Sequence, residues 1–320
     1  MHSEDHDENV YDALATADDD GRWAFGTGFD AGSAEIDAPV PDGVDRDDLA
    51  TYCLMLADDA LIASQRLAGW TAKAPELEED VALANIALDL LGQARVLLSR
   101  AGHLGAAEPF RAGPWDAQRS GAGPLPQDDE DVLTYFRDDR GFRNVTLVES
   151  DSGGAGDFGR TIAWILVLSS WRLALMTRLT DSRDPVLAAV AGKAVKELTY
   201  HRDYAAQWTL RLGDGTELSH ARMQAGLDTV WPFVEELFLP HAVERRLAAA
   251  GVAVDPAELR DEVDAVLEQV LPVATLTRPE RPAVGLVGGR GGRDGVHTES
   301  LGTVLAVMQS LARAHPEATW

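Results

Sequence analysis

Three polar residues interrupt a strongly apolar helical segment at residues 76–100 and are the first candidates for chemistry. Asn85, Asp89 and Gln93 recur every four residues, so they stack on one line of a helix. Apolar side chains fill most other positions, which predicts a helix contacted from several sides. A carboxylate inside such a bundle is costly unless a cation, a hydrogen-bond donor or a metal compensates it. The partner of Asp89 therefore decides what this helix does.

A second polar group lies in the middle of the helix predicted for residues 185–212. It consists of Glu197, Tyr200 and His201. Carboxylates and histidines contributed by several helices of one bundle are the ligands of di-iron centres. A metal site is therefore the first chemical hypothesis to test against the residue spacing.

A di-iron bundle takes one Glu from each of two helices and a Glu-x-x-His pair from each of the other two, because residues three apart can hold one ion together. Asp89 is followed by Gly92 where the pattern needs histidine. Glu197 is followed by Tyr200, and His201 comes one position late, rotated by about 100° around the helix axis. The usual chelate is lost in both segments.

The other two long helices contribute little to a metal site. The helix predicted after Asp157 contains no further Asp or Glu before Asp181. The first helix, at residues 45–70, offers only the shorter side chains of Asp58 and Asp59. We therefore predict that this chain holds no metal and no other cofactor.

The structural alternative is a hydrogen-bonded polar cluster in the bundle core. Such a cluster is tolerated only when each member is satisfied, and it can then fix the register of the helices. Its expected members are Asp89, Glu197, His201, Arg172, Asn85 and Gln93.

The elements that must position these residues predict an all-α fold, a ferritin-like four-helix bundle with extra C-terminal helices. The Gly/Pro-rich span 102–156 is expected to be a long crossover between two helix pairs, which is typical of ferritin-like bundles. Four long helices are expected at 45–70, 76–100, 157–179 and 185–212. Further helices are expected from a Ser219 cap with a kink at Pro232, at 240–250, at 255–271 and at 298–314.

Two domains of unequal character are expected. Residues 1–46 are rich in Asp, Gly and Ala, and their low hydrophobicity predicts an acidic, poorly ordered extension. Residues 47–320 are expected to form the ferritin-like helical domain. The Gly/Arg-rich loop at 275–296 has no preceding strand and no following GK[ST], so it is not a phosphate-binding P-loop. We expect it to be flexible or to contact a partner.

Composition excludes several classes of function. A formal charge of −25 argues against nucleic-acid binding, which needs a basic face. No run of eighteen apolar residues occurs and no secretory signal is visible, so we expect a cytoplasmic protein without a membrane span. The single cysteine, Cys53, is expected to be a buried small hydrophobe. A high-salt cytoplasm and GC-rich codon usage are two alternative explanations of the acidic, lysine-poor composition.

Several blocks of the sequence resemble the C subunits of bacterial phenylacetyl-CoA epoxidases, the ring-epoxidising monooxygenases of phenylacetate degradation. The resemblance covers roughly residues 48–320. It is carried by LADDALIASQRLAGW, APELEEDVALANIALDLLGQAR, KELTYH and the closing HTESLGTVLAVMQSLARAHPEATW.

The resemblance implies a ferritin-like subunit that has lost metal binding and pairs with a homologous catalytic subunit. That partner would hold the di-iron centre and bind the CoA thioester. A small accessory subunit and a reductase using NADPH, flavin and an iron–sulfur centre would complete the system. Members of the family carry an acid near the place of Ser169 and a histidine near Arg172, and this sequence departs at both.

Three functions follow as hypotheses. The first is a noncatalytic structural subunit that stabilises the catalytic subunit through a large, mostly apolar interface. The second is a self-sufficient ferritin-like oxidase with a non-standard site at Asp58 or Asp59, Asp89, Glu197 and His201. The third is a helical adaptor with no oxygenase partner. Trp70, Trp164, Trp171 and Trp231 are candidates both for the partner surface and for the core.

Overall fold

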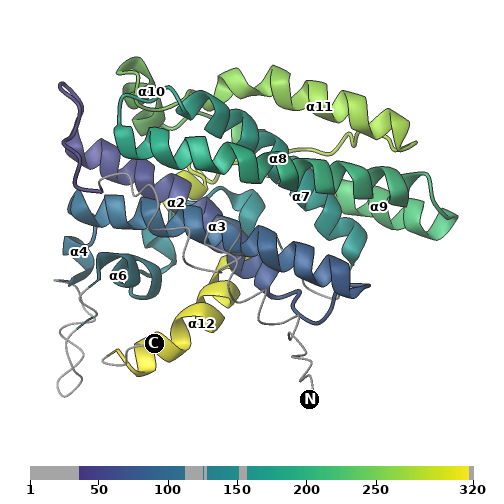
Figure 1. Cartoon of the computed structure of the whole chain (residues 1–320), viewed down its shortest axis with the longest axis horizontal. Helices are drawn as coiled ribbons and strands as arrows, with labels where there is room; N and C mark the ends of the chain where they lie inside the picture. Colours follow the sequence, from purple (N-terminus) through teal and green to yellow (C-terminus); the bar gives the residue numbers. More distant parts are fainter. Residues whose placement is uncertain (1–35, 112–124, 126–127, 151–156, 317–320) are drawn as a thin grey trace, which may run out of the picture. The chain divides into compact units, whose positions relative to one another are not determined.

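The computed structural model describes residues 36–111, 125, 128–150 and 157–316. Within these residues it contains helices and turns and no β-strand, apart from one isolated bridge between Val287 and Arg290. This confirms the predicted all-α, ferritin-like class. The four long helices are α2 (Arg46–Ala68), α3 (Leu77–His103), α7 (Phe158–Leu179) and α8 (Pro185–Gly213) (Figure 1).

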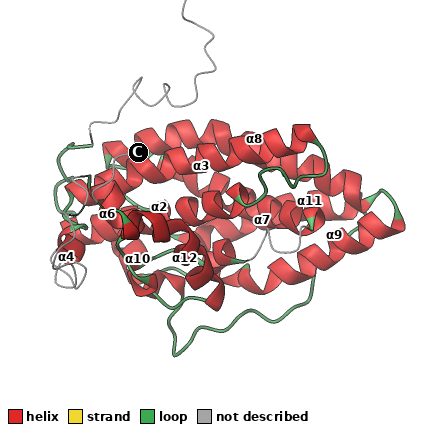
Figure 2. Cartoon of the chain, turned by 90° about the horizontal axis from the view of Figure 1, so that it is seen from below, coloured by secondary structure: helices red, strands yellow, loops and turns green. Residues whose placement is uncertain are grey.

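The four long helices form two pairs. Helix α2 packs against α3, and α7 packs against α8. Helices α3 and α8 also contact each other and lie side by side in both views, with α2 and α7 beneath them (Figures 1 and 2). The bundle therefore has an outer face made by α3 and α8 and an inner side made by α2 and α7.

The start of three long helices is fixed by aspartate caps. The side chains of Asp45, Asp157 and Asp184 each accept hydrogen bonds from backbone N–H groups of the first turn. Pro185 follows Asp184 at the first helical position, where its missing N–H costs nothing. These caps explain why the predicted starts agree closely with the observed ones.

The crossover between the two pairs is long, as predicted, and its described part contains short helical segments. These are α4 (Glu108–Arg111), α6 (Asp129–Tyr135) and the 3-10 turns η1 (Asp139–Gly141) and η2 (Thr146–Glu149). Helix α6 packs against α3, and η2 contacts α2. The crossover thus brings its own residues against the inner helix α2.

Shorter helices follow α8 along the chain and pack mainly on α7 and α2. Helix α9 lies against α7, α11 against α7 and α8, α10 against α2, and α12 against α2 and α6. Their bounds are α9 (Glu217–Val230), η3 (Trp231–Phe233), η4 (Glu235–Phe238), α10 (Ala242–Ala249), η5 (Pro256–Leu259), α11 (Arg260–Val273), η6 (Gly292–Asp294) and α12 (Glu299–Ala314).

Two details of α9 were predicted wrongly. The N-cap is Thr216, whose hydroxyl accepts a hydrogen bond from the Ser219 backbone N–H at 3.1 Å, so Ser219 is not the cap. Pro232 does not kink α9, because the helix ends at Val230 and the proline lies in the following 3-10 turn. A proline has no N–H to continue the helical hydrogen bonds, and here the α-helix ends before the proline instead of bending at it.

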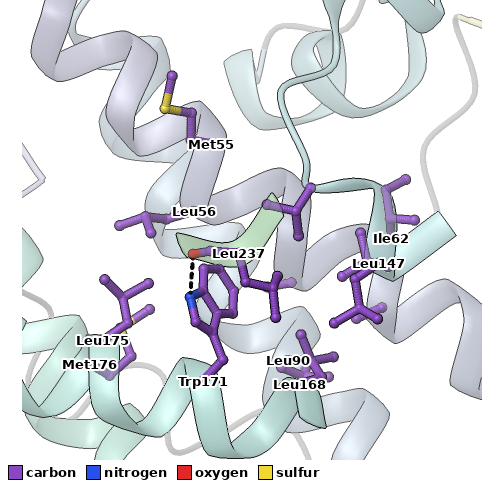
Figure 3. Packing of buried hydrophobic residues seen from close by; sticks show 14 of the residues in the cluster. Met55, Leu56, Ile62, Leu90, Leu147, Leu168, Trp171, Leu175, Met176 and Leu237 are labelled. Carbon is purple, nitrogen blue, oxygen red and sulfur yellow. Dashed lines mark hydrogen bonds between the residues drawn. The ribbon is translucent and has the colours of Figure 1, made fainter. Parts of the chain in front are cut away.

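The core is built where the two helix pairs meet. Figure 3 shows Leu56 of α2, Leu90 of α3 and Leu168 and Trp171 of α7 around one interior space. The Trp171 indole N–H donates to the Leu237 carbonyl oxygen at 3.0 Å, which ties η4 to this core (Figure 3). Trp70, Trp164 and Trp171 are at most 2% exposed, so these three belong to the core. Cys53 is also buried, as expected.

Two helices are long and apolar enough to span a membrane by length and composition alone. In α7, 89% of the most apolar window is buried inside the protein, so its hydrophobicity serves the core. In α3 only 56% of the corresponding window is buried. Helix α3 therefore carries apolar side chains that the described chain does not cover.

Part of the predicted acidic extension is attached to the bundle. The fully buried Arg100 guanidinium of α3 donates to the carbonyl oxygens of Ile36 and Ala38 at 2.8 and 2.6 Å. The same guanidinium pairs with Asp184 at 2.7 Å. The carbonyl oxygens of Ile36 and Ala38 thus tie the end of the extension to α3, and residues 1–35 lie outside the described residues.

Candidate metal centre and its buried ion pairs

Asp58 of α2 is fully buried, and both of its carboxylate oxygens accept hydrogen bonds. Two terminal nitrogens of Arg137, from the crossover, donate to its two carboxylate oxygens at 2.9 and 2.5 Å. The backbone N–H of Arg143 adds a bond of 2.8 Å to the same carboxylate. A bidentate guanidinium with an additional amide is the arrangement that makes a buried carboxylate tolerable.

Asp59, the next residue, has a different cation. Arg293 donates to both of its carboxylate oxygens at 3.0 and 2.9 Å, and the backbone N–H of Val145 donates at 2.8 Å. The Arg293 guanidinium also bonds the carbonyl oxygens of Met55 and Arg143 at 3.0 and 2.9 Å. This carboxylate is therefore fully engaged by protein donors.

The opposite charges of Asp59 and Arg293 stabilise each other. Burial acts to lower the pKa of Arg293, but the charges of Asp59 and Glu244 outweigh it and raise that pKa above its ordinary value. Burial also acts on Asp59 and raises the pKa of its carboxyl, against the opposing charge of Arg293. Because both oxygens of Asp59 receive guanidinium N–H groups, the pair is held as an ion pair.

A third cation, Arg172 of α7, lies at the centre of the bundle and is 1% exposed. Its Nε donates to Gln93 Oε1 at 3.0 Å, and its Nη2 donates to the Leu56 carbonyl oxygen at 3.2 Å. Gln93 in turn donates from Nε2 to Glu197 Oε2 at 2.9 Å. One chain of hydrogen bonds thus joins α7, α3 and α8.

Burial sets the electrostatics of this chain of hydrogen bonds. It lowers the pKa of Arg172 to about 10, although the charge of Asp59 acts in the opposite direction. Burial also raises the pKa of Glu197, and the hydrogen bond from Gln93 opposes that rise. The Gln93 amide bridges the two charged groups, accepting from Arg172 Nε and donating to Glu197 Oε2.

The partner of Asp89, which the sequence left open, is His201. The His201 Nε2 lies 3.0 Å from Asp89 Oδ2, across the contact between α3 and α8. The imidazole is buried, whereas 36% of the Asp89 side chain is exposed, so this pair lies at the rim of the outer face. Tyr200 is 51% exposed and its ring stacks on Tyr204, outside the core. Gly92 is buried within α3.

The residues present do not fit a di-iron centre. Asp58, Asp59 and Glu197 accept from three separate donors, Arg137, Arg293 and Gln93, and the two guanidiniums already neutralise the aspartates that a dication would need. Among the described residues, no three His, Cys, Asp or Glu side chains are placed to hold a metal ion. The cavity beside Arg172 and His201 has a volume of about 10 Å³, room for about one water molecule.

Arg137 and Arg293 were missed by reasoning from sequence. Arg137 lies just after α6 in the crossover, and Arg293 belongs to the loop predicted to be flexible or partner-contacting. That prediction is wrong for its last residues, since Gly292 and Arg293 are buried. The presence of Asp58 and Asp59 in an apolar helix could have indicated that two cations lie nearby, because a buried carboxylate needs compensation.

Glycine allows the buried arginine to reach α2. A Cβ at Gly292 would lie 2.0 Å from the Asn144 carbonyl oxygen, so only glycine permits this approach of two backbones. Next to it, the fully buried Glu149 accepts hydrogen bonds from Asn144, His297 and Thr298. The crossover and the C-terminal segment are therefore locked together beside α2.

Comparison with known proteins assigns the family. The family model described as phenylacetic acid catabolic protein matches residues 37–320. The chain belongs to this family. It is also 43% identical over 272 residues to the C subunit of the 1,2-phenylacetyl-CoA epoxidase of Escherichia coli (strain K12), and the match covers 85% of this chain and 99% of that protein.

As a phenylacetic acid catabolic protein, the chain has a role in phenylacetate catabolism. The resemblance stated from the residue blocks is confirmed. In this family member, the bundle interior contains the buried ion pairs Asp58–Arg137 and Asp59–Arg293.

Proposed function

We propose that this chain is a noncatalytic structural subunit of a phenylacetyl-CoA epoxidase. In this proposal a homologous partner subunit holds the di-iron centre and epoxidises the ring of phenylacetyl-CoA. A small accessory subunit and a reductase with NADPH, flavin and iron–sulfur chemistry complete a cytoplasmic hetero-oligomer. The support from comparison is the 43% identity to the C subunit of the Escherichia coli epoxidase.

The observation that carries the proposal is the saturation of the inward-facing carboxylates. Asp58 and Asp59 each bind a guanidinium in bidentate fashion, and Glu197 accepts from Gln93. Binding iron would require breaking these pairs and leaving buried guanidiniums without counter-ions, which is costly. The bundle interior is organised to hold its own helices in register.

The outer face of α3 and α8 supports a docking role. Leu77, Val81 and Leu88 are 74%, 52% and 44% exposed. Their spacing of four and seven residues places them on one line of α3. Tyr200 of α8 is exposed beside the Asp89–His201 pair. A row of exposed apolar residues on a helix pair is typical of a protein–protein interface.

In the proposal the di-iron partner packs over this face. A stable hetero-oligomer buries on the order of 2,000 Å² or more, and an exposed helix pair offers an area of that kind. The Asp89–His201 pair lies at the edge of the apolar line, so it contributes polar contacts at the rim. The role of the chain is then to stabilise the partner through a large helical contact.

Reconstitution tests the proposal. The chain alone, the di-iron partner alone and the mixture are assayed with phenylacetyl-CoA, NADPH, dioxygen and the reductase, and iron is measured in each purified chain. We expect turnover only in the mixture, with iron in the partner. Turnover by the isolated chain, with iron between Asp89 and Glu197, would instead establish a self-sufficient oxidase. Failure to bind the partner at all would favour a helical adaptor.

A further inference from the structure

A cavity of about 230 Å³ on the side of α11 is lined by three arginines and one tryptophan. The tryptophan is Trp231 in the turn after α9. Arg260 begins α11, and Arg278 and Arg281 follow its end. These residues lie apart from the ion pairs described for the bundle core. In a chain with a formal charge of −25, the convergence of three guanidiniums on one cavity needs an explanation.

Each of the three guanidiniums is held in place by a carboxylate through one terminal nitrogen. Glu235 lines the cavity, and the other two acids, Asp264 and Asp228, pair with arginines that line it. The Nη2 atom forms the salt bridge in each case. Arg260 pairs with Glu235 at 2.5 Å, Arg278 with Asp264 at 2.8 Å, and Arg281 with Asp228 at 2.6 Å.

Aromatic rings orient two of the three guanidiniums further. The Arg260 guanidinium lies 4.3 Å from the centre of the Phe238 ring, and that of Arg278 lies 5.2 Å from the centre of the Trp231 ring. Such stacking fixes the plane of a guanidinium. Because a guanidinium has five N–H donors, the salt bridge through Nη2 leaves donors on Nε and Nη1 for a ligand.

We infer that this cavity binds a phosphate-bearing organic ligand. Phosphate oxygens accept hydrogen bonds from Arg260, Arg278 and Arg281, and the organic part of the ligand packs on Trp231. Arginine suits this role because its rigid fork matches the geometry of phosphate oxygens. The site uses side chains, so it differs from a P-loop, which uses backbone N–H groups and a lysine.

The charge balance of the cavity shapes the expected binding. The three acids offset the three guanidiniums, so recognition depends on directed hydrogen bonds and not on an excess of positive charge. The arginine side chains are 34% to 54% exposed, and salt screens such contacts. We expect binding in the micromolar to submillimolar range that weakens as salt is added.

Calorimetric titration of the isolated full-length chain tests the inference. The probes are coenzyme A, adenosine 3′,5′-bisphosphate, pyrophosphate and, as a phosphate-free control, phenylacetate. The variant is Arg278→Gln/Arg281→Gln, which removes two guanidiniums. Arg246→Gln is the matched control, because Arg246 is an exposed arginine paired with Asp48 that does not line the cavity.

We expect saturable binding of the phosphorylated probes, no binding of phenylacetate, and an affinity at least tenfold lower in the double variant only. Tighter binding of coenzyme A than of pyrophosphate would support the site with a ring contact on Trp231. Equal binding would overturn the contact between Trp231 and the organic part of the ligand. A Trp231→Leu variant separates the two cases, since it weakens only the probes that carry a ring.

Absence of saturable binding at millimolar probe, or equal binding by wild type and double variant, would overturn the inference. If the double variant instead weakened only the association with the di-iron partner, the arginines would belong to a protein contact and the inference would be wrong. The titration uses the chain without its partner, so its outcome is separate from that of the proposed function. Circular dichroism of each variant verifies that it is folded.

Discussion

Arg293 lies 234 residues after Asp59 in the sequence, yet its guanidinium donates to both carboxylate oxygens of Asp59 at 3.0 and 2.9 Å. The pair joins the last long loop of the chain to the first helix of the bundle. Arg137 does the same for Asp58 from the crossover, at 2.9 and 2.5 Å. The two adjacent aspartates of α2 therefore collect one cation from each of two distant, non-periodic segments.

Breaking the Asp59–Arg293 pair should destabilise the fold strongly. Arg293→Met leaves the Asp59 carboxylate buried without its cation, and we expect a loss of about 3–5 kcal/mol in the free energy of unfolding by urea titration. The double variant Asp59→Leu/Arg293→Met should lose less than the sum of the single changes, because no unpaired charge remains. Arg246→Gln, at an exposed pair, should leave the unfolding midpoint nearly unchanged. Simple additivity would contradict the assigned pairing.

The glycine that precedes Arg293 should be intolerant of a side chain. Gly292→Ala places a Cβ 2.0 Å from the Asn144 carbonyl oxygen, so the loop must shift, and we expect a loss of at least about 2 kcal/mol. Gly302→Ala is the matched control, since it lies in α12 with no atom within 4 Å of the added Cβ. That change should stabilise by about 0.5–1 kcal/mol through helix propensity. Thermal and urea unfolding of the two variants should therefore move in opposite directions.

His297 predicts a dependence of stability on pH. Burial acts to lower the pKa of His297, but the hydrogen bond and charge of Glu149 outweigh it, and the pKa is raised. The stabilisation is therefore complete below the unfolded pKa of about 6.5 and is lost as pH rises through the higher folded pKa. The difference in unfolding free energy between wild type and His297→Gln should shrink across that window. A difference that grows with pH would contradict the sign.

The apolar line of α3 should control association with the partner. Val81→Glu places a charge at a position that is 52% exposed, in the proposed contact. We expect its affinity for the di-iron subunit to fall at least tenfold, mainly through faster dissociation in a surface-plasmon measurement. Val307→Glu makes the same change at a 69% exposed position of α12 and should bind normally. Equal effects of the two changes would remove the α3–α8 face from the proposal.

Glu197 separates a structural role from a catalytic one. Glu197→Gln keeps an oxygen that can accept the hydrogen bond from Gln93, and the pKa of Glu197 is already raised by burial. We expect the stability to change by less than about 1 kcal/mol and the reconstituted complex to keep its kcat. Loss of a carboxylate ligand of iron would abolish turnover. An inactive but fully assembled complex would therefore contradict the noncatalytic role.

Helix boundaries and the class of the fold were predictable because local signals decide them. Asp45, Asp157 and Asp184 cap their helices whatever the tertiary context, and apolar periodicity defines the helices that follow. A polar cluster shared by Asp89 and His201 was expected from their places on two helices of one bundle, although their direct pairing was not. These predictions needed only the neighbourhood of each residue along the chain.

The cations of the core could not be predicted in the same way. Arg137 and Arg293 reach α2 from segments whose course depends on the whole fold, and no periodicity marks them. The outer face shows a second limit. Helix α3 was expected to be contacted from several sides, yet Leu77 and Val81 are exposed, because an apolar pattern is the same for a core face and for a face that binds another protein.

The long sequence separation of the Asp59–Arg293 pair also constrains how the protein is made. While the ribosome is still synthesising the chain, Asp59 of α2 emerges 234 residues before the arginine that neutralises it. A nascent chain that stops short of residue 293 would bury a carboxylate with no counter-charge, which opposes packing of the first helix pair. The final arrangement of the bundle is therefore reached only after residue 293 has left the exit tunnel, and products truncated before it should remain targets for chaperones and proteases.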